Sequence, residues 1–173
     1  HNESEEYDGT SWTEGNNLQT ARSGTASAGT QTAALISGGL ENPPSPPSAK
    51  SEEYDGTNWA EGNDLNSNRY GAGGMGIQTA ALAAGGNPDT VNVESYDGTS
   101  WTEIADLNTG RQDLSGAGTQ TAGLAFGGGP PNTGVTESWD GSSWTEVADL
   151  STVGWNLRGA GSSTDALVMG RYT

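Results

Sequence analysis

The sequence contains one short stretch four times, as SEEYDGTSWTE, SEEYDGTNWAE, ESYDGTSWTE and ESWDGSSWTE. The last aromatic residue of each copy is Trp12, Trp59, Trp101 or Trp144, at successive intervals of 47, 42 and 43 residues. One small sheet cannot cover its own faces, so units of this length stack against one another and share a core. The repeat therefore predicts several equivalent units, each of four short strands, packed side by side.

Further residues recur at the same intervals and divide each unit into strands. Four Asp-Gly pairs lie between aromatic-bearing runs and predict tight hairpins, because glycine accepts the positive φ that such turns require. A Gly/Ala-rich run and an Ala/Leu run complete the unit, and the Ala/Leu pattern is typical of a strand buried between neighbouring sheets. We expect structural roles for the repeated aromatic and glycine positions, which are Tyr7, Trp12, Gly38, Gly39, Tyr54, Trp59, Gly85, Gly86, Tyr96, Trp101, Gly127, Gly128, Trp139 and Trp144.

The order of a double glycine, a tyrosine, a tryptophan and then an arginine resembles the kelch repeat of β-propellers. The resemblance covers essentially the whole chain, in three good copies and one degraded copy that ends at Gly170-Arg171. The sequence is also similar to the Gly-rich kelch-like arrays in tail-fibre and surface proteins of phages and bacteria. The resemblance implies an all-β propeller of four-stranded antiparallel blades. Two departures are a shorter Tyr-to-Trp interval, which tightens the hairpin, and fewer blades than kelch propellers usually have.

The order of the elements predicts how the ring closes. We expect one propeller domain over residues 1–173, with a half-blade at 1–15, blades at about 20–62, 67–104 and 109–147, and a closing half-blade at 152–173. The first half-blade holds a third and fourth strand and the last holds a first and second. Their pairing would close a four-bladed monomeric ring, which the small residues of the first strands favour. Two alternatives are a homodimer that shares an eight-bladed ring by exchanging halves, and a fragment of a longer array.

Composition excludes several classes of function. The chain has 6 Lys and Arg residues and 22 Asp and Glu residues, which give a net charge of −16. Binding to nucleic acid or to anionic membranes requires clustered basic residues, so neither is an expected partner. No apolar run is long enough for membrane insertion. Without cysteine, and with His1 as the only histidine, thiol nucleophiles and His/Cys metal sites are excluded. We expect no cofactor, with an oxygen-ligand Ca²⁺ site left as an alternative.

Candidate ligand-binding residues lie on the side of the repeat where one unit leads to the next. Arg22, Arg69 and Arg111 each follow their tryptophan by ten residues, and Gly154 with Trp155 beside it stands in the fourth copy. We interpret these arginines as a partial ring that binds a polar ligand such as a glycan. The candidate set is Arg22, Arg69, Arg111, Asn17, Asp64 and Trp155. The alternative is that each Arg pairs with a neighbouring Glu or carbonyl group.

The loops on this side vary where the rest of the repeat is constant. They cover residues 40–51, 87–93 and 129–136 and read LENPPSPPSAKS, NPDTVNV and GPPNTGVT. Variable loops on a rigid scaffold suit recognition. The alternative is that they are tolerated insertions.

The predicted function is a non-catalytic binding module, extracellular or virion-associated, that recognises a surface glycan or protein receptor from a phage fibre or bacterial surface protein. The first alternative is a structural spacer without a ligand. The stretch SYDGTSW also resembles the Asp-box of sialidases with one residue missing, which leaves a sialidase-like glycosidase as a minor alternative. We expect no enzyme, because the three arginines occupy equivalent repeat positions and no separate Tyr-Glu nucleophile pair is visible.

Overall fold

The computed structural model describes residues 2–41, 46–88 and 91–170. Within these ranges the chain forms 18 β-strands and no helix, so no helix is available to cross a membrane. The predicted all-β class and the four-stranded antiparallel sheets are therefore confirmed.

Three complete sheets follow one another along the chain. The first has β4 (Ala26–Thr30), β5 (Ala33–Ser37), β7 (Ser51–Tyr54) and β8 (Trp59–Glu61). The second has β9 (Gly73–Ile77), β10 (Ala80–Ala84), β11 (Val93–Tyr96) and β12 (Trp101–Glu103). The third has β13 (Ser115–Thr119), β14 (Ala122–Phe126), β15 (Thr136–Trp139) and β16 (Trp144–Glu146). In each sheet, the hydrogen-bonded order of the strands follows chain order.

Two hairpins flank the three sheets. The N-terminal hairpin is β1 (Glu5–Tyr7) with β2 (Trp12–Glu14), and the C-terminal hairpin is β17 (Arg158–Gly161) with β18 (Ala166–Met169). A short two-stranded sheet of β3 (Arg22–Ser23) and β6 (Leu40–Glu41) lies beside the first sheet. The inner strands contact one another in the order β4, β9, β13, β17.

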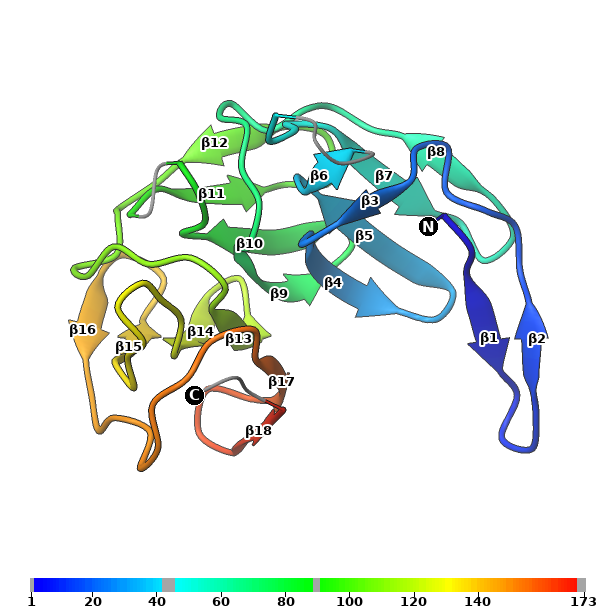
Figure 1. Ribbon diagram of the computed structural model, residues 1–173. Coiled ribbons are helices and arrows are strands. Elements are labelled where there is room, and N and C mark those ends of the chain that lie inside the picture. Colours follow the sequence, from blue (N-terminus) through cyan, green and yellow to red (C-terminus); the bar gives the residue numbers. More distant parts are fainter. Residues whose placement is uncertain (1, 42–45, 89–90, 171–173) are drawn as a thin grey trace.

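The expected pairing of the two terminal hairpins within one molecule is wrong for the described residues. Figure 1 shows an open arc with the N-terminal hairpin at one end and the C-terminal hairpin at the other. In this structure β1 pairs only with β2, and β17 only with β18. A hollow of about 350 Å³ lies on the concave side, lined by residues of all four inner strands.

The small residues of the inner strands are explained by contacts between neighbouring inner strands. A Cβ atom on Gly74 would lie 2.3 Å from the carbonyl oxygen of Ser27 in the preceding inner strand. A Cβ atom on Gly159 would lie 2.7 Å from the carbonyl oxygen of Gly116. Glycine is therefore required where successive inner strands approach closely.

The aromatic repeat positions face each other across the outer hairpin of every unit. Tyr54 lies opposite Trp59 and Tyr96 opposite Trp101, and the four such ring pairs have centroids 4.8 to 5.2 Å apart. The turn between the two rings is fixed by its aspartate, since Asp97 Oδ1 accepts the backbone N–H groups of Thr99 and Ser100 at 2.8 Å each. This is the Asp-Gly hairpin that the sequence predicts.

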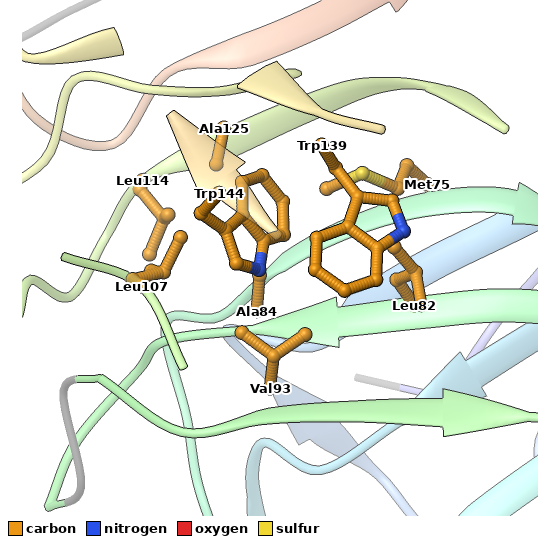
Figure 2. Close-up of a cluster of buried hydrophobic side chains, with 9 residues drawn as sticks. All are labelled: Met75, Leu82, Ala84, Val93, Leu107, Leu114, Ala125, Trp139 and Trp144. Atoms are coloured by element: carbon orange, nitrogen blue, oxygen red, sulfur yellow. The ribbon is translucent and has the colours of Figure 1, made fainter. Parts of the chain in front are cut away.

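The apolar core lies between the sheets, where each unit covers the face of the next. Figure 2 shows the largest cluster, between the second and third sheets, where the rings of Trp139 and Trp144 pack among aliphatic side chains. The cluster consists of Met75, Leu82, Ala84, Val93, Leu107, Leu114, Ala125, Trp139 and Trp144. Leu107 and Leu114 come from the connection between the two sheets, so the connection itself contributes to the core.

The repeat supplies a matched test of this packing. Trp144→Ala should reduce the free energy of unfolding by about 3–5 kcal/mol, because the side chain is buried between two sheets. Trp12→Ala, at the same repeat position, should cost about 1 kcal/mol or less in dilute solution, because Trp12 is exposed and loses only its contact with Tyr7. Urea unfolding of both variants gives the comparison, and equal losses would contradict the packing described.

Candidate functional site

Each predicted arginine is buried and bound within the fold. Arg69 Nη2 lies 2.6 Å from Glu94 Oε1, and both side chains are 1% exposed. Arg69 Nη1 also donates to the carbonyl oxygens of Gly85 at 3.2 Å and Asn92 at 2.8 Å. Arg22 with Glu52 and Arg111 with Glu137 repeat the arrangement at 2.7 and 2.6 Å.

The glutamate of each pair also holds the connecting segment that contains the arginine. Glu94 accepts the backbone N–H groups of Asn66 at 2.7 Å and Ser67 at 3.1 Å. A buried carboxylate is tolerated when it is paired and when its remaining lone pairs accept hydrogen bonds. The Arg–Glu unit therefore fastens the connection between two sheets to the third strand of the following sheet.

This geometry supports the alternative interpretation of the arginines rather than the ligand ring. The guanidinium groups point into the protein and are occupied by carboxylates and carbonyls. Burial by itself would raise the pKa of Glu137, but hydrogen bonds from Arg111 and from the N–H of Asn108 outweigh it, so that the pKa lies below its ordinary value of 4.5. Glu137 is therefore ionised at neutral pH, as an ion pair requires.

The fourth copy has the same backbone arrangement without the arginine. The N–H of Gly128 donates to the carbonyl of Gly154 at 2.9 Å, just as the N–H of Gly86 donates to the carbonyl of Arg111 at 3.0 Å. Gly154 therefore occupies the arginine position. The side chain that follows it, Trp155, is 37% exposed.

The residue after the arginine position is the variable position of the repeat, and its pattern was not recognised from the sequence. It is occupied by Ser23, Tyr70, Gln112 and Trp155. The residue that follows has a positive φ in all four copies, at 67° in Gly24, 69° in Gly71, 55° in Asp113 and 56° in Asn156. A constant left-handed turn thus presents a different side chain in each copy. Aligning the copies on the arginine would have revealed it.

Two of these variable side chains line one hollow. It has a volume of about 310 Å³, and the residues around it are Gln112, Asp113, Gly129, Pro130, Asn132 and Trp155. Gln112 and Gly129 form an antiparallel bridge with N–H···O distances of 3.0 and 2.9 Å, which fixes the loop 129–132 against the turn. The hollow therefore combines one aromatic side chain with amide and carboxyl groups.

Asp113 is held firmly at the base of this turn. Its N–H donates to the carbonyl of Gly71 at 2.7 Å, and its own carbonyl accepts the N–H of Asn156 at 2.8 Å. Burial raises the pKa of its carboxyl above 3.8, although Gln112 Nε2, 3.3 Å away, and the charge of Arg158 oppose the rise. A carboxylate accepts hydrogen bonds from the hydroxyl or ammonium groups of a ligand.

The other candidate residues lie elsewhere. Asn17 and Asp64 are exposed and are not among the residues that line the hollow. Their neighbours Asn16 and Asn63 donate to the carbonyls of Thr57 at 2.9 Å and Thr99 at 2.6 Å, in outer hairpin turns of the next sheet. This places the two segments at the periphery. Of the variable loops, residues 42–45 and 89–90 lie outside the described residues, as does Arg171.

Comparison with known proteins gives no family: no family model matches the sequence, and no curated protein matches it. Among the described residues, no three His, Cys, Asp or Glu side chains are grouped so that they could hold a metal ion. The hollow beside Trp155 is therefore the candidate site on geometry alone.

Removing one arginine should show that the pair is structural. Arg69→Met should lower the free energy of unfolding by about 3–5 kcal/mol, because Glu94 is left buried and unpaired. Adding Glu94→Gln should recover part of this loss, since the charge disappears while an oxygen acceptor remains. Arg158→Met, at an exposed arginine, is the control and should change stability by about 0.5 kcal/mol or less. Equal effects of Arg69→Met and Arg158→Met in denaturant unfolding would contradict the structural role.

The hairpin aspartates predict the response to acid. Hydrogen bonds from the hydroxyl of Thr10 and the following N–H groups lower the pKa of Asp8 to about 2, and those from Ser142 and Ser143 lower that of Asp140 to about 2. The folded pKa is below the ordinary value of 3.8, so these aspartates stabilise the fold fully above about pH 4 and lose that contribution as pH falls towards 2. The melting temperature should fall over this interval, and Asp140→Asn should flatten its slope. A melting temperature independent of pH between 4 and 2 would refute the prediction.

Proposed function

We propose that the chain is a kelch-like propeller array that acts as a non-catalytic binding module, and that the hollow beside Trp155 binds one sugar residue of a surface glycan. The observation that carries the proposal is that Trp155, which is 37% exposed, lines a hollow of about 310 Å³ together with Gln112, Asp113 and Asn132. The volume is at the lower end for small-ligand sites.

The side chains of the hollow suit a sugar in kind and number. An aromatic ring offers apolar area at little cost in conformational entropy, and it packs on the apolar face of a pyranose ring. The amides of Gln112 and Asn132 each offer donors and an acceptor, and the carboxyl of Asp113 accepts. The chain carries a net charge of −16, which favours a neutral or cationic sugar over a sialylated or sulfated one.

The lining of the hollow also favours binding over catalysis. Glycosidases of the two-carboxylate type need a pair of acidic side chains that flank the scissile bond. Asp113 is the only carboxyl among the residues that line this hollow. A binding site on a phage fibre or bacterial surface protein, extracellular or virion-associated, remains our proposal for its setting, on the strength of the resemblance in the repeat.

The alternative function is a structural spacer. It is favoured by the three buried Arg–Glu pairs, since most repeated features of the chain are accounted for by stability alone. A spacer tolerates the variation among Ser23, Tyr70, Gln112 and Trp155 on one constant turn but does not require it. That variation is what a recognition surface needs.

Binding to an array of neutral, amino and sialylated glycans separates the two functions. The protein should bind at least one neutral or amino glycan, and Trp155→Ala should weaken that binding at least about tenfold, as loss of one aromatic anchor does. Ile77→Ala is the matched control, because Ile77 is an exposed apolar residue at the end of β9, paired with Ala80, and does not line the hollow. Folded protein that binds no glycan, or an equal loss in both variants, would refute the site.

A further inference from the structure

We infer that the hollow beside Trp155 is one end of a longer site, and that its ligand is a chain of linked sugar residues that extends across Asp113 to Tyr70. The inference rests on the proposed binding of a sugar residue in the hollow, and it adds the length and the direction of the glycan. The observation that carries it is the way in which the backbone joins the four variable positions of the repeat.

The four left-handed turns are hydrogen-bonded to one another in series. The N–H of Gly71 donates to the carbonyl of Gly24 at 2.7 Å. In the same way, the N–H of Asp113 donates to the carbonyl of Gly71 at 2.7 Å, and that of Asn156 to the carbonyl of Asp113 at 2.8 Å. The residues that precede these turns therefore form one continuous row across the four units, in the order Ser23, Tyr70, Gln112 and Trp155.

The backbone of this row is already paired, so recognition falls to its side chains. Tyr70 and Asn87 exchange two N–H···O bonds at 3.1 and 2.8 Å, as Gln112 and Gly129 do at 3.0 and 2.9 Å. A ligand that crosses the row therefore meets side chains on a backbone that is fixed in advance. Such a surface loses little conformational freedom on binding.

Asp113 joins the hollow to the neighbouring turn. Its carboxyl group lies beside Gly71, because a Cβ atom on Gly71 would be 2.6 Å from Asp113 Oδ1. Asp113 also lines the hollow together with Trp155. Gly71 directly follows Tyr70, so the carboxyl group lies between the two aromatic residues along the row. A sugar hydroxyl or ammonium group bound to Asp113 is therefore placed between two aromatic surfaces.

Tyr70 provides the second aromatic surface. Its side chain is half-buried and lies against the first turn, since a Cβ atom on Gly24 would be 3.8 Å from both Cβ and Cδ2 of Tyr70. A tyrosine offers a flat apolar ring to a sugar and a hydroxyl group that donates and accepts hydrogen bonds. Ser23, the next residue of the row, has no ring, so the aromatic part of the site ends at Tyr70.

The row also sets the length of the ligand. Two hydrogen-bonded steps separate the turn at Gly71 from the turn at Asn156, and each step between paired backbone segments is about 5 Å. The hollow takes one sugar residue, so a ligand that also contacts Tyr70 needs at least two linked residues. Once the first residue is bound, the second contact is intramolecular and gains from a high effective concentration.

A series of glycans of increasing length tests the inference. The probes are soluble linear oligomers of one to four residues, made of glucose, galactose, mannose, N-acetylglucosamine or glucosamine. NMR titration gives the Kd of each. For at least one of these sugars the affinity should rise at least about tenfold from one residue to three, because a second aromatic contact is added.

Substitutions in the row identify the source of this gain. Tyr70→Ala should abolish it, so that three residues bind no more tightly than one, whereas Trp155→Ala should weaken the binding of every length. Tyr7→Ala is the matched control, because Tyr7 is an exposed tyrosine of the N-terminal hairpin and lies outside the row. Urea unfolding establishes that each variant is folded. Tyr70→Leu, which retains more of the side-chain volume without the ring, replaces Tyr70→Ala if the smaller side chain prevents folding.

The outcomes separate this inference from the proposed function. A gain with length that is lost in Tyr70→Ala and kept in Tyr7→Ala supports the extended site. A smaller gain, or a gain that Tyr70→Ala leaves intact, overturns the extended site but leaves the hollow as a site for a single sugar residue. Failure of every oligomer to bind, single residues included, would refute the proposed function and this inference with it.

Discussion

The buried ion pair between an arginine in each connection and a glutamate in the following sheet holds this arrangement of sheets together. In the pair of Arg69 and Glu94, one guanidinium donates to a carboxylate and to two carbonyls. The carboxylate also accepts hydrogen bonds from two backbone N–H groups of the connection. Taking two charges out of water is costly, and the additional hydrogen bonds of both groups offset part of that cost. In a chain with 31% apolar residues, such a pair fixes how one sheet is placed on the next where a larger apolar core would otherwise be needed.

The sequence was sufficient to predict the sheets because each one is specified locally. The Asp-Gly turns and the facing aromatic residues determine the outer hairpins, and the Ala/Leu run marks the strand next to them. What the sequence could not determine depends on contacts between units. The regular spacing of Arg22, Arg69 and Arg111 is the same whether the side chains point outward to a ligand or inward to Glu52, Glu94 and Glu137. The small residues at Gly74 and Gly159 suggested a narrow ring. They are needed because a neighbouring strand leaves no room for a Cβ atom, and the sequence of a single unit does not reveal this contact.

The candidate site could not be found from the repeat for the opposite reason, because it lies at a position where the side chains of the copies differ. A repeated scaffold fixes the backbone at equivalent positions. The side chain just before the residue of constant positive φ can therefore diverge without loss of stability. Ser23, Tyr70, Gln112 and Trp155 are such a series. Gly154 fits the same view, because the fourth copy keeps the backbone hydrogen bond to Gly128 although the arginine is absent.

The size of the hollow limits how tightly it can hold a ligand. A volume of about 310 Å³ beside Trp155 matches the single sugar residue that we propose. A site that holds a single sugar binds weakly, because few atoms make contact and part of the gain is lost in immobilising the ligand. Several such sites on one rigid frame raise the effective concentration for a repeated glycan, and overall binding can exceed that of one site by about 10²–10⁴. Several hollows acting together are therefore a physical route by which such a small site could hold a surface coated with repeated sugars.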